Sequence, residues 1–161
     1  MAPALSKLKA AKLKAAKSGA VKAKGIETSG DYGSRDYDSV KQLILQALAT
    51  IRSEHFEDYF DLFTDDAVWM MPSNSEDVHI EKARSFYGFT KNFWFDQETS
   101  IDELLVSGDL AYVRVSFDGY LRPKKDKAAP PLRSVSRHIW IMQKQLNGEW
   151  KISRDIWNNP K

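Results

Sequence analysis

The Asn-Gly pair at residues 147–148 constrains the fold more than any other feature, because alternating apolar and polar residues lie on both sides of it. Asn-Gly is the strongest short signal for a two-residue hairpin turn, and such a turn joins antiparallel strands. Residues 134–146 and 149–157 are therefore predicted to pair. A second break, at residues 107–109, divides residues 99–121 into another hairpin. The second half of the chain is expected to form a four-stranded antiparallel meander.

The residues before this meander have helical periodicity instead. Apolar side chains recur at helical spacing between residues 39 and 51, and Ser39 with Gln42 forms a capping-box signature for the start of a helix. Residues 53–63 predict a second, short helix with aromatic rings on one side and acidic residues on the other. Both helices are expected to pack one face against a core.

A third helix is predicted over residues 79–93, with an apolar stripe that continues to Trp94. The segment before it, residues 65–72, indicates a short strand that ends at Pro72. Residues 122–132 form a Lys- and Pro-rich loop that is unsuited to the interior of a sheet. This order of elements predicts an α+β fold with helices on one face of a curved sheet.

Composition excludes several kinds of chemistry. The chain has no cysteine, which rules out disulfides and thiolate catalysis, and its three histidines are scattered. We therefore expect no metal site and no cofactor. Asp65 and Asp66 are interpreted as turn and capping residues because no third ligand lies near them.

The charge of the chain is unevenly distributed. Residues 1–24 contain seven lysines and no acidic residue. Since the whole chain has 24 basic and 22 acidic residues, the remainder has 17 and 22, a net charge of −5. We predict a lysine-rich, flexible arm and linker over residues 1–37 and one domain over residues 38–161. Binding of nucleic acid by the acidic domain is disfavoured, because electrostatic attraction dominates such binding.

The lysine-rich arm has two interpretations. It is either a solvated tail, which is the usual role of a run of charge, or an electrostatic anchor to an acidic protein, nucleic acid or anionic lipid. It lacks the apolar face of an interfacial helix and the apolar stretch of a secretion signal. The longest apolar run, residues 67–71, is too short to cross a bilayer. These observations predict a soluble, intracellular protein that is not secreted.

Three motifs resemble a known superfamily: "LFTDDAVWMMP" after the second helix, "EKARSFY" in the third, and "NGEWKISRDIWN" at the end. Over residues 38–160 the chain is similar to the SnoaL-like, nuclear-transport-factor-like superfamily, above all to its ketosteroid-isomerase homologues. The resemblance implies a cone-shaped, cystatin-like α+β fold, in which three N-terminal helices pack on a curved antiparallel sheet. It also implies a deep apolar pocket inside the cone.

The same resemblance shows which isomerase groups this chain lacks. The general base would lie at Met71, the donor tyrosine near Ala47 and the partner acid near Trp140. Isomerase chemistry needs a carboxylate base and two donors to the substrate oxygen. The resemblance therefore implies the fold without this activity.

The last strand supplies the remaining site candidates. Strict alternation places Ser153, Asp155 and Trp157 on one face, and by resemblance that face looks into the cone. Asp155 and His138 are the candidate catalytic groups. A structural role is favoured for each: Asp155 would pair with Arg137, His138 or an N–H at a helix end, and His138 would be a hydrogen-bonded core residue. The candidate pocket residues, whose aromatic rings could also simply fill a core, are Trp69, Met71, Tyr87, Trp94, Trp140, Ser153 and Trp157.

The opposite face of the last strand is the candidate interface. By strict alternation it would present Trp150, Ile152, Arg154 and Ile156. In the superfamily that this chain resembles, this face often forms a homodimer, where an arginine among apolar groups acts as a hydrogen-bond donor.

Two functions follow from these expectations. The first is a pocket domain that binds a small apolar or aromatic molecule, with acid–base chemistry of the isomerase, lyase or hydrolase type. The alternative is a non-catalytic association or scaffold subunit of a larger assembly, tethered by its basic arm. The sequence alone defines neither the substrate nor whether there is a reaction.

Overall fold

The computed structural model of the chain describes residues 21–23, 35–53, 55–86, 88 and 90–160. Within these residues the helices are α2 (Arg35–Ser53), α3 (Phe56–Phe60) and α4 (Ile80–Phe86), with a short 3₁₀ turn, η2 (Thr90–Asn92). The strands are β1 (Val21–Ala23), β2 (Phe63–Met70), β3 (Val78–His79), β4 (Phe93–Ser107), β5 (Leu110–Pro123), β6 (Leu132–Lys144) and β7 (Trp150–Asn158). The fold is therefore α+β.

All seven of these strands belong to one sheet, in the order β1-β4-β5-β6-β7-β2-β3. The predicted meander is confirmed, because β4 to β7 pair consecutively and antiparallel. The sheet as a whole is mixed, however, since β2 pairs parallel with β7 and β1 pairs parallel with β4. The expectation of a purely antiparallel sheet was wrong at these two junctions.

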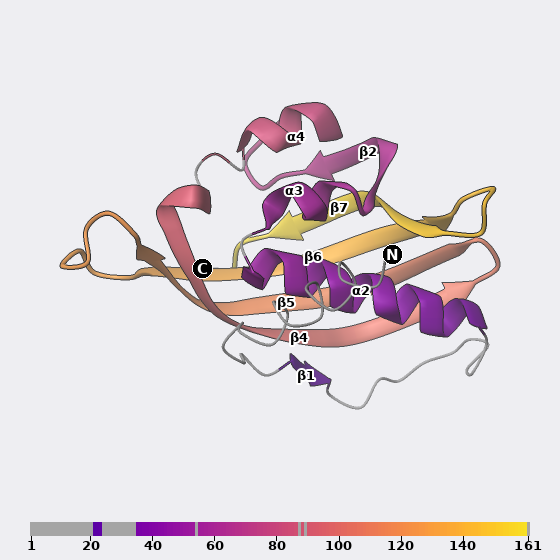
Figure 1. Ribbon diagram of the computed structural model, residues 1–161, viewed down its shortest axis with the longest axis horizontal. Helices are drawn as coiled ribbons and strands as arrows, with labels where there is room; N and C mark the ends of the chain where they lie inside the picture. The colour runs from indigo at the N-terminus through magenta and orange to yellow at the C-terminus, as the bar shows by residue number, and fades with distance from the viewer. Residues whose placement is uncertain (1–20, 24–34, 54, 87, 89, 161) are drawn as a thin grey trace, which may run out of the picture.

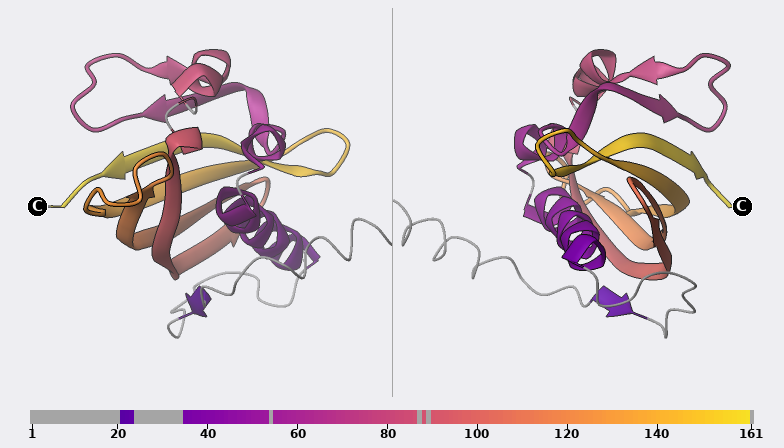
Figure 2. Two further views of the ribbon diagram at one scale, coloured as in Figure 1. Left: turned by 60° about the vertical axis from the view of Figure 1, so that its left-hand side comes forward. Right: turned by 90° about the vertical axis from the view of Figure 1, so that its right-hand side faces the viewer.

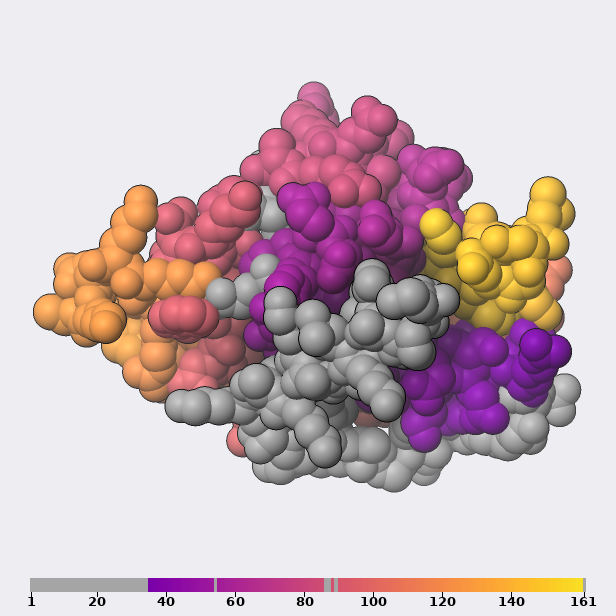
Figure 3. Space-filling view, viewed as in Figure 1, coloured from indigo at the N-terminus to yellow at the C-terminus, as the bar shows by residue number. Residues whose placement is uncertain are grey.

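The sheet curves around the helices, and α2 and α3 lie on its concave face (Figures 1 and 2). The apolar side of α2 is buried as its spacing predicted, because a one-faced helix gains free energy by removing that face from water. It joins inward residues of β4, β5, β6 and β7 in a single core. The loop between β5 and β6 extends beyond the helices at one end of the molecule (orange, left in Figure 3).

Both predicted hairpins are present, although the second turn is longer than a two-residue turn, because residues 146–148 lie between its closing pair, Gln145 and Glu149. Gly108 has a φ of 58° and Gly148 a φ of 84°, the left-handed region that glycine enters at little cost. The backbone N–H of Gln145 donates to the carbonyl of Glu149 at 2.7 Å and closes the second turn. These turns set the register of the strands that build the site.

The bounds of all three predicted helices differ from the prediction. Helix α2 begins at Arg35, so residues 35–37 belong to the helix and Ser39 is no cap; its hydroxyl instead donates to the carbonyl of Arg35 at 2.8 Å. Helix α3 ends at Phe60, because Phe63 already pairs with β7. Within the predicted flexible arm, residues 21–23 form β1, while residues 1–20 and 24–34 lie outside the described residues.

The third predicted helix is much shorter than its apolar stripe indicated. Helix α4 ends at Phe86, and β4 begins at Phe93, where pairing with Pro123 of β5 takes over. Trp94 is therefore a strand residue on the outward face of β4. Its side chain is 54% exposed, and the ammonium of Lys124 lies 4.4 Å from its ring centre.

The last strand contains a β-bulge that the sequence did not reveal. Ile141 of β6 is opposite Arg154, but the next residue, Met142, is opposite Ile152, so Ser153 has no partner across the strands. The extra residue shifts the alternation by one position. Trp150 and Ile152 consequently face the core, where both are buried, and not the outer surface as predicted. Only Arg154 and Ile156 of the predicted interface remain on the outer face.

Candidate functional site

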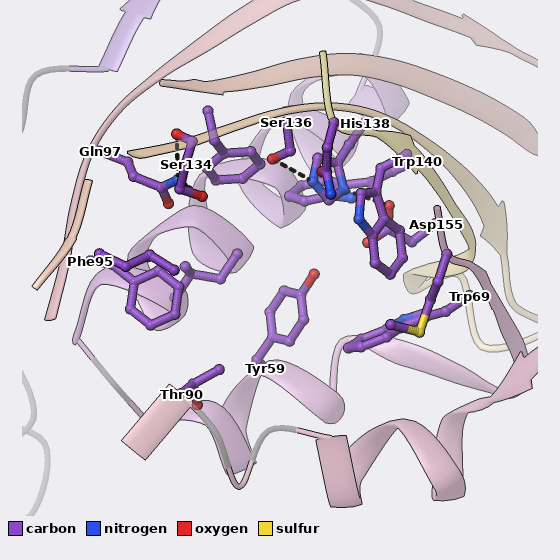
Figure 4. Close-up of a pocket in the computed structure, with 16 residues that line it drawn as sticks. Tyr59, Trp69, Thr90, Phe95, Gln97, Ser134, Ser136, His138, Trp140 and Asp155 are labelled. Atoms are coloured by element: carbon purple, nitrogen blue, oxygen red, sulfur yellow. Dashed lines mark hydrogen bonds and ion pairs between the residues drawn. The ribbon is translucent and has the colours of Figure 1, made fainter. Parts of the chain in front are cut away.

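A cavity of about 230 Å³ lies between the concave face of the sheet and the helices (Figure 4). Six aromatic rings, each from a different element, form most of its wall: Tyr59, Trp69, Phe95, Phe117, Trp140 and Trp157. Tyr59 of α3 points its hydroxyl into the space, as Figure 4 shows. The lining thus favours an apolar or aromatic occupant that carries at least one polar group.

One wall of the cavity is polar, and it follows strand β6. Ser134, Ser136 and His138 are alternate residues of this strand, so their side chains share its inner face. At the outer end, the side-chain amide of Gln97 from β4 donates to the hydroxyl of Ser134 at 3.0 Å. A row of polar side chains therefore lines one wall of an otherwise aromatic cavity.

The centre of this row is a histidine–aspartate pair. His138 Nδ1 lies 2.8 Å from Asp155 Oδ1, within ordinary hydrogen-bond distance. Asp155 is only 4% exposed and belongs to β7, the neighbour of β6. An ionised carboxylate can only accept, so Nδ1 of His138 donates in this contact, and Nε2 of a neutral imidazole then carries the lone pair.

The ring of His138 is held by its neighbours. Trp157 stacks on it with ring centres 5.2 Å apart and planes at 14°, and Phe117 contacts it edge-on at 5.1 Å. On the other side of the ring, Nε2 lies 3.0 Å from the hydroxyl of Ser136. Both nitrogens of His138 therefore have a polar partner, and the aromatic rings restrict its orientation.

Comparison with solved structures identifies the fold. A ketosteroid isomerase-like protein from Erwinia carotovora atroseptica aligns with a TM-score of 0.68 at 19% identity, covering 80% of this chain and 98% of that one. A nuclear transport factor 2 superfamily protein from Salmonella enterica gives 0.62 at 16% identity, with 78% and 91% covered. The chain has the nuclear-transport-factor-like fold.

A further similar structure is that of a protein from Novosphingobium aromaticivorans described as a scytalone dehydratase. It aligns with a TM-score of 0.64 at 15% identity, covering 78% of this chain and 85% of that one. Neither a family model nor a curated protein matches the sequence. Similarity at these identities establishes the shared fold, and the activity has to be argued from the site.

Most of the predicted site residues meet in the cavity of this nuclear-transport-factor-like domain. Asp155 and His138 lie together on the polar wall, and four predicted pocket residues line the space: Trp69, Met71, Trp140 and Trp157. Asp155 was expected to have a partner, with His138 as one candidate, and the pair is now identified. Met71, at the position of the isomerase base, offers no carboxylate, and Ala47 is buried in the core.

Two predicted pocket residues lie elsewhere, and a third is not described. Ser153 is fully buried at the bulge, where its hydroxyl donates to the carbonyl of Ile141 at 3.1 Å. Trp94 points away from the cavity, because alternation along β4 turns Phe95 and Gln97 inward instead. Tyr87 lies outside the described residues.

Two polar residues of the cavity wall, Ser136 and Gln97, were not predicted from the sequence. Ser136 is two residues before His138, so alternation along one strand already placed both side chains on the same face. Gln97 could not be found in the same way, because residues 79–93 were predicted to be helical and the long first half of β4 was not recognised.

Three further predictions concerned Asp65 and Asp66, metal binding and membrane-spanning segments. Asp65 and Asp66 are exposed residues within β2, not turn residues. Among the described residues, no three histidine, aspartate or glutamate side chains come together as a metal site would require. No helix in the described part of the chain is long and apolar enough to cross a membrane.

Proposed function

We propose that this domain binds a small aromatic or apolar molecule and moves protons on it, with His138 as the general acid and base. The observation that carries the proposal is the 2.8 Å contact between His138 Nδ1 and Asp155 Oδ1 in the wall of an aromatic cavity. General acid–base groups need a lone pair or proton that faces the substrate, and histidine is the side chain best suited to this near neutral pH.

The roles of the two residues differ. His138 Nε2 takes a proton from a C–H or O–H bond of the bound molecule and returns it to another atom or to a leaving group. Asp155 is a positioning residue, because its carboxylate holds the Nδ1–H tautomer and stabilises the imidazolium that forms. Such chemistry covers isomerisation, elimination of a leaving group and addition of water.

The dimensions of the cavity restrict the substrate. Pockets for drug-sized ligands commonly measure about 300–1,000 Å³, and this one measures about 230 Å³. A molecule with one or two rings suits it. Its polar group is expected against the row formed by Gln97, Ser134, Ser136 and His138.

The names of similar structures support acid–base chemistry in a general sense. Two of them are described as ketosteroid isomerase-like and scytalone dehydratase-like proteins. The isomerase groups themselves are absent here, since Met71, Ala47 and Trp140 occupy their expected positions. The proposed base is therefore on β6, and the base position expected for an isomerase, directly before Pro72, is not used.

The elimination of nitrobenzisoxazole tests this proposal without knowledge of the natural substrate. A base removes the ring C–H proton, the N–O bond breaks, and a coloured cyano-nitrophenolate is released. We expect the full-length protein to catalyse this elimination, and His138→Gln to lower the rate by about 100-fold, the scale of general-base catalysis. His79→Gln is the matched control, because His79 is exposed on β3. Equal rates for the wild type and His138→Gln would refute the assignment.

We also propose that a second copy of the chain covers the outer face of β6 and β7. Ile139 and Ile156 are directly opposite each other on this face, and Ile139 is 41% exposed. Arg154 on the same face donates to the carbonyls of Ser153 and Asp66 at 2.7 and 3.3 Å.

The scaffold alternative needs the basic arm, which lies mostly outside the described residues, so the pocket function is preferred.

A further inference from the structure

The contact of His138 Nε2 with a hydroxyl carries an inference beyond proton transfer. Ser136 Oγ, His138 Nε2, His138 Nδ1 and Asp155 Oδ1 form an unbroken relay, with distances of 3.0 Å and 2.8 Å across its two hydrogen bonds. A hydroxyl, a histidine and a carboxylate linked in this order are the parts of an activated serine nucleophile. We infer that Ser136 is a nucleophile that accepts an acyl group from a small ester bound in the cavity.

The position of Ser136 suits this role. It is half-buried and lines the cavity, so a bound molecule can reach its oxygen. Alternation along β6 presents Ser136 and His138 from the same strand, and Asp155 reaches the far side of the ring from β7. The stacked Trp157 and the edge-on Phe117 hold the imidazole between the two oxygens. The relay therefore depends on rigid strands and not on loops, which favours catalysis.

Other serines of the described chain lack this arrangement. Ser134 also lines the cavity, but its hydroxyl accepts from the amide of Gln97. Ser116 is on the outer face of β5, and its hydroxyl donates to the carboxylate of Asp102 without a histidine between them. Ser136 alone among these three has a base within hydrogen-bond distance.

A donor for the developing oxyanion is available on the same strand face. Trp140 follows His138 by two residues, lines the cavity and is fully buried. Its indole N–H has no hydrogen-bond acceptor within the described part of the chain. A buried donor without an acceptor is costly, and a reorientation of the indole toward an oxyanion in the cavity would satisfy it.

The reaction balances without any added cofactor. Ser136 Oγ forms a bond to the acyl carbon of the ester while its proton passes to His138 Nε2. The bond from the acyl carbon to the leaving alkoxide breaks, and the alkoxide takes the proton from His138. Water then attacks the acyl-serine with its proton going to His138, and the carboxylic acid leaves as Ser136 regains its hydrogen. Nothing is oxidised or reduced.

Phosphonylation of the full-length protein by a small alkyl fluorophosphonate tests the nucleophile directly. Serine oxygen attacks phosphorus, fluoride leaves, and the intact mass rises by one phosphonyl group. We expect one adduct per chain, located on Ser136 by peptide mapping of the wild type, so the result does not depend on whether a variant folds. Ser136→Ala should lose the adduct, His138→Gln should form it about 100-fold more slowly, and the matched control Ser116→Ala should keep it. No adduct on the wild type, or an adduct on another residue, would overturn the inference.

The inference shares the histidine–aspartate pair with the proposed function, and two readouts separate their failures. Turnover of nitrobenzisoxazole with no phosphonylation would leave the acid–base proposal standing and reject Ser136 as a nucleophile. Phosphonylation of Ser136 with no turnover of nitrobenzisoxazole would support the nucleophile and reject proton transfer to carbon acids. Release of nitrophenolate from nitrophenyl acetate in an initial burst would further support an acyl-enzyme.

Discussion

Ile152 and Asp155 both point to the concave side of the sheet, although an odd number of positions separates them on the same strand. Regular alternation would have put them on opposite faces. The bulge at Ser153 absorbs one residue between them, so Ile152 remains in the core while Asp155 enters the wall of the cavity. The position of the candidate site thus depends on one irregularity in β7.

The bulge is stabilised by the hydroxyl of Ser153, which donates to the carbonyl of Ile141 at 3.1 Å. Ser153→Ala removes this bond and leaves a buried acceptor without its partner. We expect the free energy of unfolding to fall by about 1 kcal/mol, as measured by urea denaturation. Ser107→Ala, at an exposed position, is the control. A Ser153→Ala protein as stable as the wild type would show that the hydroxyl does not hold the bulge.

Asp155→Asn tests the positioning role of the carboxylate. The amide has nearly the same shape but carries no charge, so it can neither stabilise the imidazolium nor enforce the Nδ1–H tautomer as strongly. We expect the maximal elimination rate with nitrobenzisoxazole to fall by at least about tenfold. The substrate concentration that gives half of the maximal rate should change little. Circular dichroism checks that the fold is retained. An unchanged rate would mean that His138 works without Asp155.

Asp36 predicts a dependence of stability on acid pH. Its carboxylate accepts hydrogen bonds from Lys144 and from the indole of Trp150, and these contacts lower the pKa of Asp36 below its ordinary value of 3.8. The stabilisation is therefore present above about pH 4 and is lost as the pH falls through the folded-state pKa. Asp36→Asn should reduce the melting temperature at neutral pH and flatten its decline in acid. Asp38→Asn, exposed in the same helical turn, should behave like the wild type.

Gly119 permits the close approach of β5 to β4. A Cβ at this position would lie 2.2 Å from the carbonyl oxygen of Asp96 and 2.6 Å from the Cα of Gln97. Both obstacles are backbone atoms, so Gly119→Ala must push β4 away. We expect the unfolding free energy to fall by about 1–3 kcal/mol, with weaker binding of a naphthol probe because Gln97 lines the cavity. A stable variant with unchanged probe affinity would show that the strands adjust freely.

A dimer formed through the outer face of β6 and β7 would bury Ile139 and Ile156, so a charge at either position should prevent dimerisation. Ile139→Asp introduces a charge that a dimer interface would have to bury, whereas a free surface would leave it hydrated. Sedimentation velocity should show a dimer for the wild type and a monomer for Ile139→Asp. Leu146→Asp, at an exposed position in the β6–β7 turn, is the control. A dimer that survives Ile139→Asp would place the contact elsewhere.

Local patterns predicted much of the fold. The spacing of apolar residues in α2 identified its buried face, and the two glycine turns identified both hairpins, since these signals depend on neighbouring residues only. The apolar stripe over residues 79–93 predicted a helix longer than α4, which ends at Phe86, because an apolar run does not show where a helix gives way to a strand. Pairing of Phe93 with Pro123, a contact between distant parts of the chain, decided in favour of the strand.

The sequence by itself determined the antiparallel meander, the amphipathic first helix and the presence of a carboxylate and a histidine on neighbouring strands. These follow from periodicity and turn chemistry, which short stretches of chain encode. Only the tertiary structure decided that Asp155 meets His138, that Ser136 completes the relay and that Trp150 and Ile152 face the core. Register and bulges depend on how whole strands fit together, and that fit is a property of the packed sheet.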